Sequence, residues 1–575
     1  MKKQNKRNQI LGFLAFFAAL WLLNLASNRV LARLDLTEEK RYSLAESTRE
    51  LLKSLDERVL VTVYLEGDFP SGFRKLQRET RQMLNEFRAY SPYLEYRFID
   101  PSNQPDEKSR NELYQQLRSK GLISYQIDVN EKGGSRSIQV FPGAIVALGE
   151  QEISVQILQG LMGQSAESQM NASVEKLEYN LANAIKRITT KTRPTIAFLE
   201  GHGQLKPNYL ADLGRTLSEY YRVERFNLRQ FDTQDSSENI SISAQMRRLN
   251  SYNALLIAKP TQGFADLDRY LIDQYIMQGG KVVWLVDMVL AEMDSLSRRS
   301  EFLAIPLDEK LNLRDMLYKY GVRVNTDLVQ DIMATGLNDS RSIKPWIYAP
   351  MVMPYIEHPI TKDLNGIRLD FASSIDTILA PGIKKTILLQ TSPYSRTAGT
   401  PHVVSLARLY EKHNPANFQK GPITLGVLME GSFTSAFANR VKPRSTNGEE
   451  LPMVEKGKTT QMVVIGDGDL ARNQLNIVNP NLPKGLPLTT GYDQFTDTHY
   501  GNKDFMLNVF DFLLDKSGMM ALRSRELKIR LLDMQRIQTE RQFWVGLNTV
   551  LPLVSILLLS SLTALMRRHK YAKNP

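Results

Sequence analysis

Two long apolar runs stand at opposite ends of this 575-residue chain. The first, Ile10–Ala26, contains one polar residue, Asn24, and the second, Phe543–Met566, contains no charged residue. A helix of about 20 residues crosses the roughly 30 Å hydrocarbon core of a bilayer. The two runs therefore predict one membrane-spanning helix at each end of the chain.

The first run has a second interpretation, because a basic start followed by an apolar stretch also describes a signal peptide. Ala26-Ser27-Asn28 is a poor cleavage site, and the run is longer than most signal-peptide cores. We therefore expect an uncleaved anchor. The second run has clearer flanks, since Trp544 lies where an interfacial aromatic residue belongs and Pro552 is tolerated in a membrane helix.

Basic residues flank both runs on their outer sides. The first run follows Lys2, Lys3, Lys6 and Arg7, and the second precedes Arg567, Arg568, His569, Lys570 and Lys573. The positive-inside rule then places both termini in the cytoplasm. We expect a tip and membrane helix over residues 1–30, a second membrane helix over 543–566 and a cytoplasmic tail over 567–575. The chain between them would lie in the periplasm, beyond the inner membrane.

Residues 35–190 alternate β-rich runs with helical spacing, which predicts a first α/β domain with a thioredoxin-like layer. Ser43 and Glu46 fit a capping box that opens its first helix. The predicted strands are Val59–Leu65, Leu94–Ile99, Tyr125–Val129 and Ile138–Leu148, and the predicted helices are Ser43–Leu55, Phe73–Tyr90, Glu107–Lys120 and Met170–Thr189.

Residues 194–515 repeat this alternation on a larger scale, which predicts a second α/β domain with a mostly parallel sheet. We expect Phe231–Asn250, Ser342–Pro359 and Asn439–Thr460 to be irregular. A charged helix over residues 521–542 would form a stalk that runs into the second membrane helix. The predicted strands are Thr195–Leu199, Val223–Asn227, Ala254–Ala258, Lys281–Val286, Ile375–Leu379, Thr386–Gln390, Ile423–Met429 and Gln461–Ile465, and the predicted helices are Tyr209–Tyr221, Leu267–Gln278, Leu313–Tyr320 and Lys503–Leu514.

The amino-acid composition excludes several classes of function but does not identify one. The net charge is +11, but the basic residues form no stripe interleaved with aromatic residues, so nucleic-acid binding is not expected. The chain has no cysteine, which excludes thiol nucleophiles, thiolate metal sites and disulfides. It also has no Walker A motif, so it does not hydrolyse ATP by that route.

A Gly-His-Gly turn follows the predicted strand Thr195–Leu199, and ligands of α/β sheets bind where strand ends meet such turns. A hydrolase would place Ser or Cys here, whereas this turn carries Glu200 and His202. The chain has six histidines, none in an H-x-x-x-H or H-x-H pair, so a metal site is not expected. We favour a structural role for His202, with a binding role as the alternative.

A second strand-end turn, Gly466–Asp469, carries two carboxylates that could bind a cation or a sugar hydroxyl. The alternative is a turn whose Asp side chains accept local backbone N–H groups. Serines after two other strands lack the G-x-S-x-G spacing and show no His/Asp partner in the sequence. If the strand ends converge, a polar cleft is predicted that binds a ligand without catalysis, cofactor or metal, and it would be lined by Glu200, His202, Asp287, Asp467 and Asp469.

Ten motifs spread over nearly the whole chain resemble the GldG family of gliding-motility-associated ABC transporter auxiliary proteins of Bacteroidota. They are DLTEEKRY (Asp35–Tyr42), VYLEGDFP (Val63–Pro70), FPGAIV (Phe141–Val146), IAFLEGHG (Ile196–Gly203), LIDQYIMQGGKV (Leu271–Val282), SSIDTI (Ser373–Ile378), SPYSR (Ser392–Arg396), FTSAFANR (Phe433–Arg440), GNKDF (Gly501–Phe505) and LRSRELKIRLLD (Leu522–Asp533).

The resemblance implies a membrane-anchored, substrate-binding-like subunit that works with a separate permease and a separate cytoplasmic ATPase. It also implies a large α/β domain shared with an intraflagellar-transport family and suspected of binding carbohydrate, and it supplies no catalytic residues. We expect the stalk to couple the ATPase and permease to a periplasmic body. The alternatives are a carbohydrate- or peptidoglycan-binding scaffold and a periplasmic hydrolase.

Overall fold

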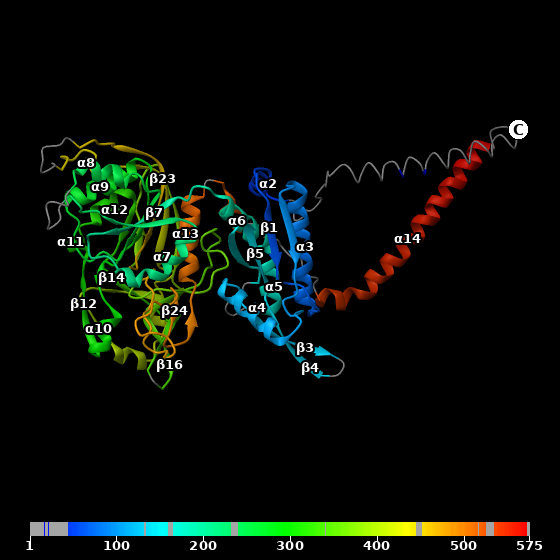
Figure 1. Cartoon of the computed structure of the whole chain (residues 1–575), viewed down its shortest axis with the longest axis horizontal. Coiled ribbons are helices and arrows are strands. Elements are labelled where there is room, and N and C mark those ends of the chain that lie inside the picture. Colours follow the sequence, from blue (N-terminus) through cyan, green and yellow to red (C-terminus); the bar gives the residue numbers. More distant parts are fainter. Residues whose placement is uncertain are drawn as a thin grey trace. The chain divides into compact units, whose positions relative to one another are not determined.

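The computed structural model describes residues 17, 21, 44–131, 134–158, 165–231, 240–339, 341–443, 451–515, 517–524 and 534–571 (Figure 1). The chain divides into two compact units. One unit is Leu44–Arg525, called the body below, and the other combines Met1–Ser43 with Glu526–Pro575. The predicted membrane helix Ile10–Ala26 lies outside the described residues except for Phe17 and Trp21, which are helical.

The first sheet of the body has four strands in the order β2-β1-β5-β6. β1 and β2 are parallel, whereas β5 runs antiparallel to both β1 and β6. β1 has the sequence V-L-V-T-V and is almost fully buried, because helices pack against the sheet. The strands are β1 (Val59–Val63), β2 (Leu94–Phe98), β5 (Gly143–Leu148) and β6 (Gln151–Gln156), and the helices of this region are α2 (Glu46–Lys53), α3 (Ser71–Tyr90), α4 (Glu107–Ser119), α5 (Ala166–Glu175) and α6 (Leu177–Thr189).

Three predictions for this region differ from the structure. The predicted single strand Ile138–Leu148 is two strands, because Phe141-Pro142 separates β5 from β4 (Gly134–Val140), which pairs with β3 (Tyr125–Glu131). Proline has no N–H for a ladder bond, which explains the break. The predicted helix Met170–Thr189 is interrupted at Lys176, between α5 and α6.

The third difference concerns the start of the first helix. The predicted capping box depends on Ser43, which lies outside the described residues. α2 begins at Glu46, and its N-cap residue is Ala45, which has no side-chain cap. The backbone N–H of Ala45 instead donates to Glu178 Oε1 at 2.7 Å, so a side chain from α6 stabilises this helix start.

The second sheet has seven strands in the order β19-β22-β23-β10-β9-β7-β8. The five strands from β23 to β8 are parallel, and β22 runs antiparallel to both of its neighbours. The body therefore has a mixed α/β fold, with β8 at one edge of this sheet. The strands are β7 (Thr195–Glu200), β8 (Arg222–Asn227), β9 (Ala254–Ala258), β10 (Lys281–Leu285), β19 (Ile383–Gln390), β22 (Thr424–Thr434) and β23 (Lys456–Ile465).

Helices cover both faces of the second sheet, so its central strands are apolar on both sides. Alternate residues of β7 belong to different cores: Ala197 and Leu199 pack on one face, and Ile196 and Phe198 on the other. This alternation follows from the two-residue period of a strand. The covering helices include α7 (Ala211–Ser218), α8 (Ile242–Leu249), α9 (Asp266–Met277), α12 (Arg314–Tyr320) and α13 (Asn502–Leu514).

All three segments predicted to be irregular contain regular structure; in Asn439–Thr460, strand β23 already begins at Lys456. Within Ser342–Pro359, residues Ile343–Val352 form the ten-residue strand β16, whose Trp346 and Tyr348 are buried. Its two prolines face positions near a register shift in the pairing with β15 (Ala334–Asn338), where proline is tolerated. Within the predicted loop Phe231–Asn250, helix α8 begins after Ser241, whose side chain accepts from the Ala244 N–H.

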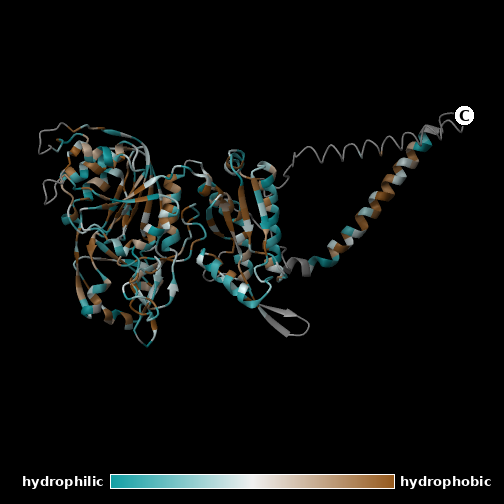
Figure 2. Ribbon diagram, viewed as in Figure 1, coloured by the Kyte–Doolittle hydropathy of each residue, from teal (hydrophilic) through white to brown (hydrophobic). Residues whose placement is uncertain are grey.

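The C-terminal helix α14 spans Met534–Tyr571 and contains Pro552. Among the described residues, one helical stretch, Thr539–His569, is long and apolar enough to cross a membrane (Figure 2). The predicted stalk is helical from Met534, whereas residues 525–533 lie outside the described part of the chain. Just before them, Met519–Ser524 forms a 3₁₀ helix, so the stalk does not begin as the predicted α-helix at residue 521.

Candidate functional site

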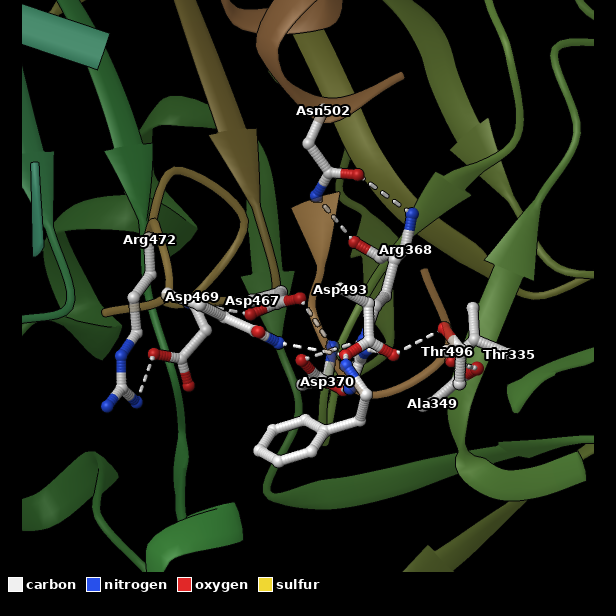
Figure 3. A network of polar contacts seen from close by, with 12 residues as sticks. Thr335, Ala349, Arg368, Asp370, Asp467, Asp469, Arg472, Asp493, Thr496 and Asn502 are labelled. Atoms are coloured by element: carbon white, nitrogen blue, oxygen red, sulfur yellow. Dashed lines mark hydrogen bonds and ion pairs between the residues drawn. The ribbon is translucent and has the colours of Figure 1, made fainter. Parts of the chain in front are cut away.

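A pocket of about 360 Å³ lies beside the carboxyl end of β23. We call it the strand-end pocket; Figure 3 shows the polar network around it. Because β10 and β23 are parallel neighbours, the turns that follow them emerge at the same edge of the sheet. The lining includes Tyr209, Asp294, Arg368, Asp370, Asp467, Asp469, Arg472, Gln474, Tyr492, Asp493, Gln494, Phe495, Tyr500 and Asn502.

The turn Gly466–Asp469 can reach this position because two of its residues have no side chain. A Cβ atom on Gly466 would collide with the carbonyl oxygen of Ser373, whose own N–H donates to the Gly466 carbonyl at 2.6 Å. A Cβ atom on Gly468 would lie 2.7 Å from the Lys259 side chain. Both glycines are therefore required by the close approach of neighbouring residues.

Asp467 is completely buried at the centre of this turn. Its Oδ1 accepts the Asp469 N–H at 2.7 Å, and its Oδ2 accepts the Asp370 N–H at 2.8 Å. Burial, together with the nearby carboxylates of Asp287 and Asp469, raises the pKa of Asp467 well above its usual value. Both oxygens accept backbone N–H groups, so the side chain holds two loops together.

Asp287 follows β10 and lies against the same turn. Its Oδ1 accepts the Gly468 N–H at 2.5 Å, and its Oδ2 lies 3.4 Å from Lys259 Nζ. Lys259 also pairs with Asp469 and lies 3.8 Å from Glu292. Burial raises the pKa of Asp287 to about 6, against the opposing effect of Lys259. Burial lowers the pKa of Lys259, but its carboxylate neighbours outweigh this and raise it overall.

Arg368 forms the other half of the network. Its guanidinium donates to Asp370 at 3.1 Å and to Asp493 at 3.0 Å, and Asn502 bonds to both its backbone N–H and its carbonyl (Figure 3). The Asp493 carboxylate also accepts from the Thr496 hydroxyl at 2.8 Å. The fork geometry of arginine fixes the relative positions of two loops that are far apart in the sequence.

Arg472 completes the wall of the pocket. It lies 3.3 Å from both Asp469 and Asp294, and its guanidinium stacks 4.5 Å from the Tyr209 ring centroid. Five aspartates and two arginines therefore line the pocket, which favours neutral or cationic ligands over anions. No serine, cysteine, histidine or lysine occurs among the lining residues in the described part of the chain.

Glu200 and His202 lie at the end of β7, away from the strand-end pocket. The imidazole of His202 is buried, with its Nε2 3.0 Å from Asp268 Oδ2 and its ring stacked 3.9 Å from the Phe264 centroid. Glu200 pairs with Arg225 on β8. The His202 carbonyl accepts two N–H groups from the turn after β9, which is consistent with a structural role.

The structure thus brings together Asp287, Asp467 and Asp469 and separates them from Glu200 and His202. The separation arises because β9 lies between β7 and β10 in the sheet. Lys259 was detectable in the sequence, since it directly follows the buried strand β9. Arg368 and Asp493 end the two-residue strands β17 (Ile367–Arg368) and β24 (Tyr492–Asp493), and Asp370 follows β17; strands this short carry no periodic signal. Among the described residues, no group of three or more acidic or histidine side chains is arranged to hold a metal ion.

Comparison with known proteins identifies a transport family. Residues 193–509 match a family described as an ABC-type uncharacterized transport system, and residues 38–147 match a domain of unknown function. An uncharacterized protein of Borreliella burgdorferi is 18% identical over 582 residues, covering 99% of each chain. The solved mmIFT52 N-terminal domain is 14% identical, with a TM-score of 0.29, covering 56% of this chain and 96% of its own.

The first match spans more than half of the chain and includes the whole seven-stranded sheet and the strand-end pocket. Together with the candidate membrane helix Thr539–His569, it indicates a membrane-associated protein that works with transporter components. The chain belongs to the family of ABC-type uncharacterized transport system auxiliary proteins.

Proposed function

We propose that this protein is a non-catalytic auxiliary subunit of an ABC transporter, anchored in the inner membrane by a helix at each end, with its body in the periplasm. The family match over residues 193–509 carries the proposal. Its partners would be a permease and a cytoplasmic ATPase. The link to gliding motility rests on the resemblance of the sequence motifs to GldG-like proteins.

The flanks of α14 support this topology. Phe543 and Trp544 lie at one end of the apolar run, as expected at a membrane interface, and Arg567 and Arg568 follow its other end. The basic end would face the cytoplasm, and the body would then lie on the opposite side of the membrane. The N-terminal residues carry the same charge pattern and support a second anchor with a cytoplasmic tip.

We also propose that the body consists of two domains, residues 35–190 and 194–515. Each has its own sheet and hydrophobic core, which supports this division. The first sheet combines a parallel β1–β2 pair with the antiparallel β5–β6 pair, an arrangement that supports a thioredoxin-like layer. A coupling subunit needs such separate units if one is to move against the other.

The segment before α14 contacts the core of the first domain. Met519 and Met520 are 2% and 4% exposed and pack with residues of β1 and α6. Lys186 of α6 lies 2.9 Å from Asp515, whose other oxygen accepts the Met520 N–H at 2.8 Å. A displacement of this segment would therefore act directly on α6.

The same helix also contacts the second domain. Arg187 of α6 pairs with Asp511 of α13 at 3.0 Å and stacks 3.4 Å from the Tyr220 ring centroid. The Tyr221 hydroxyl donates to Asp511 at 2.5 Å. We call the contacts of α6 with α13 and residues 515–524 the α6 joint. It offers a physical route by which the stalk could pull on both domains.

The test is co-purification of the full chain in detergent at native expression levels. A permease and an ATPase should co-purify, and ATPase activity in the complex should fall when K186E disrupts the α6 joint. K186R keeps the positive charge opposite Asp515 and leaves the bonds that Asp515 accepts from the backbone intact, so it should retain activity. K75E provides a matched control, because Lys75 bonds to Asn171 within the first domain. If neither partner co-purifies, the coupling proposal fails.

The strand-end pocket favours a second candidate function, the binding of a carbohydrate or a peptidoglycan fragment. Exposed aromatic surface from Phe495, which is 46% exposed, lies beside planar polar side chains such as Arg368 and Asp370. Sugars are bound by this combination of ring faces and bidentate hydrogen bonds. Thermal shifts with cell-wall fragments should appear in the wild type and disappear in F495A. A hydrolase is less supported, since the aspartates that line the pocket are engaged by arginines or by backbone N–H groups.

A further inference from the structure

A cleft of about 500 Å³ lies beside β6, α6 and α13. Its lining includes four consecutive residues of β6, the edge strand of the first sheet, namely Ile153, Ser154, Val155 and Gln156. Successive side chains of a strand point to opposite faces of its sheet. A cavity lined by all four therefore reaches both faces of β6 and runs along its open edge, so we call it the edge cleft.

The backbone of β6 presents hydrogen-bonding groups to this cleft. The Ile157 N–H donates to the Pro142 carbonyl at 2.9 Å, which continues the ladder between β5 and β6. In an antiparallel pair, alternate residues bond to the partner strand and the residues between them point away. Val155 therefore bonds to β5, whereas the N–H and C=O groups of Ser154 and Gln156 point outwards. Ser154 is exposed, and no residue in the described part of the chain outside β5 bonds to its backbone.

Polar side chains from one face each of α6 and α13 form the other walls of the edge cleft. Residues three or four apart, and seven apart, share one face of a helix, and the polar lining residues of both helices follow this spacing. The first helix contributes amide and basic groups and the second amide and acidic groups, and the two faces meet where Arg187 pairs with Asp511 at 3.0 Å. The residues are Lys176, Asn180 and Arg187 at α6, and Asp504, Asn508 and Asp511 on α13.

Two polar groups on these walls make no hydrogen bond within the described part of the chain. The buried side-chain nitrogen of Asn180 has no partner there. The carboxylate of Asp504 is attracted by nearby cations, Arg523 first among them, without accepting a hydrogen bond. Leaving a buried donor unpaired is unfavourable, so a ligand that supplies an acceptor gains from meeting it. The edge cleft thus offers unpaired backbone groups on one wall and unpaired side chains on the other.

We propose that the edge cleft binds an extended polypeptide segment of a partner protein, which adds to β6 as a further strand of the first sheet. The outward backbone groups of Ser154 and Gln156 would hold its main chain, as in other cases of strand addition. Its side chains would alternate between two surroundings. One set meets Ile123, which is 56% exposed and whose N–H donates to Gln156 Oε1 at 3.1 Å, and the other set meets the polar walls. The partner segment therefore alternates apolar and polar residues.

A bound segment would lie against both helices of the α6 joint. Lys176 and Asn180 would contact it from α6, and Asp504 from α13, so the segment would bridge the two sides that the Arg187–Asp511 pair already connects. Peptide binding would then stabilise one arrangement of the joint. This function goes beyond that of a transporter subunit and does not depend on the permease or the ATPase.

Fluorescence polarisation with a defined peptide can test strand addition. The probe is the fluorescein-labelled hexapeptide Thr-Val-Thr-Val-Thr-Val, added to the full chain in detergent. Two matched peptides carry N-methyl groups on all valines or on all threonines, which removes the N–H donors along one edge and keeps every side chain. Because an added strand pairs through one edge, one methylated peptide should bind about tenfold more weakly and the other should bind like the unmodified probe.

Substitutions in the protein test the two walls separately. S154P removes an outward N–H without breaking a bond to β5, and edge strands tolerate proline at such positions. It should weaken binding of the probe about tenfold, whereas S154A keeps the backbone and should bind like the wild type. N180L should weaken binding about threefold, the effect of one hydrogen bond. N171L is its matched control, because Asn171 bonds to Lys75 outside the edge cleft.

Several outcomes would overturn the proposal. If the two methylated peptides bind equally well, or if a folded S154P binds like the wild type, the strand edge is not the binding element. A dimer of the chain that S154P dissociates would make a second copy the occupant, and binding of cell-wall glycans in place of the probe would assign the cleft to a sugar. Thermal unfolding checks that each variant folds; if S154P does not, the methylated peptides decide the question with the wild type alone.

Discussion

Two nearly buried lysines show opposite electrostatic behaviour in this protein. Lys259 at the strand-end pocket has a side chain 6% exposed, and Lys176, between α5 and α6, has one 8% exposed. Lys259 lies among Asp287, Asp469 and Glu292, and its pKa is raised. Lys176 has Asp363 Oδ2 at 3.6 Å, and burial lowers its pKa to about 8.

The difference teaches that burial alone moves an ammonium group towards its neutral form, and that the surrounding carboxylates decide the outcome. At the strand-end pocket, the carboxylates around Lys259 compensate its charge fully. The aspartates of this network also accept backbone N–H groups from several loops. Lys176 lies next to the α6 joint, and its surroundings compensate its charge less. The two regions are thus distinguished by the number of carboxylates around one lysine.

The largest expected effect comes from removing each lysine in turn. K259M should destabilise the folded protein by about 3–5 kcal/mol, because it leaves buried carboxylates without a partner. K176M should be neutral or stabilising, since it removes a charge that burial disfavours. Thermal and denaturant unfolding of the full chain in detergent would measure both. Equal losses in the two variants would contradict the comparison.

The pH dependence of stability should distinguish the same two regions. A carboxyl whose pKa is raised by folding is most favourable when protonated, so the contribution of Asp287 is complete below about pH 4. It is lost as the pH rises through about 6, which amounts to roughly 3 kcal/mol. D287N should therefore reduce the change in the free energy of unfolding between about pH 4 and pH 6, which denaturant unfolding at a series of pH values would measure.

The contribution of Lys176 to stability should change over a different pH range. Its pKa is lower in the folded protein than in the unfolded chain, so the charged amine disfavours the folded state. As the pH rises from about 8 to 10.5 the folded protein loses this charge first, and the free energy of unfolding should increase. K176M should remove that rise and leave the acidic window unchanged. A variant that altered both windows would show that the two regions are not independent.

The smallest expected effect concerns the packing of the strand-end turn. G466A should cost about 1–3 kcal/mol, because its Cβ would collide with the Ser373 carbonyl. G399A is the matched control, since a Cβ at Gly399 meets no atom within 4 Å. Chemical denaturation would compare the two, and an unchanged midpoint in G466A would mean that the turn can move aside.

The strands of the second sheet could be predicted because buried parallel strands appear as short runs of branched apolar residues. Ala254–Ala258 is observed with the predicted bounds, and Lys281–Val286 is one residue shorter than predicted. Strand β16 could not be predicted, because its prolines suggest a loop and its register shift arises only from pairing. Helix α8 was hidden by the polar surroundings of Ile242–Leu249.

Part of the strand-end pocket followed from the same signal. Asp467 and Asp469 line the pocket, and Asp287 lies beside them outside the lining; all three closely follow buried strands, so sequence order indicates that they share one sheet edge. Arg368 and Asp493 could not be placed, because they are 125 residues apart and meet only through tertiary packing. The interposition of β9, which separates His202 from these residues, depends on strand order, which a single sequence does not reveal.

The strand order has one more consequence, which concerns aggregation. The edge strands β8 and β2 leave backbone N–H and C=O groups open to pairing with another molecule. Both edges carry charged side chains, namely Arg222, Glu224 and Arg225 on β8 and Glu95 and Arg97 on β2. A protein held at a membrane meets its own copies at high local concentration, and these charges discourage the sheets from joining edge to edge.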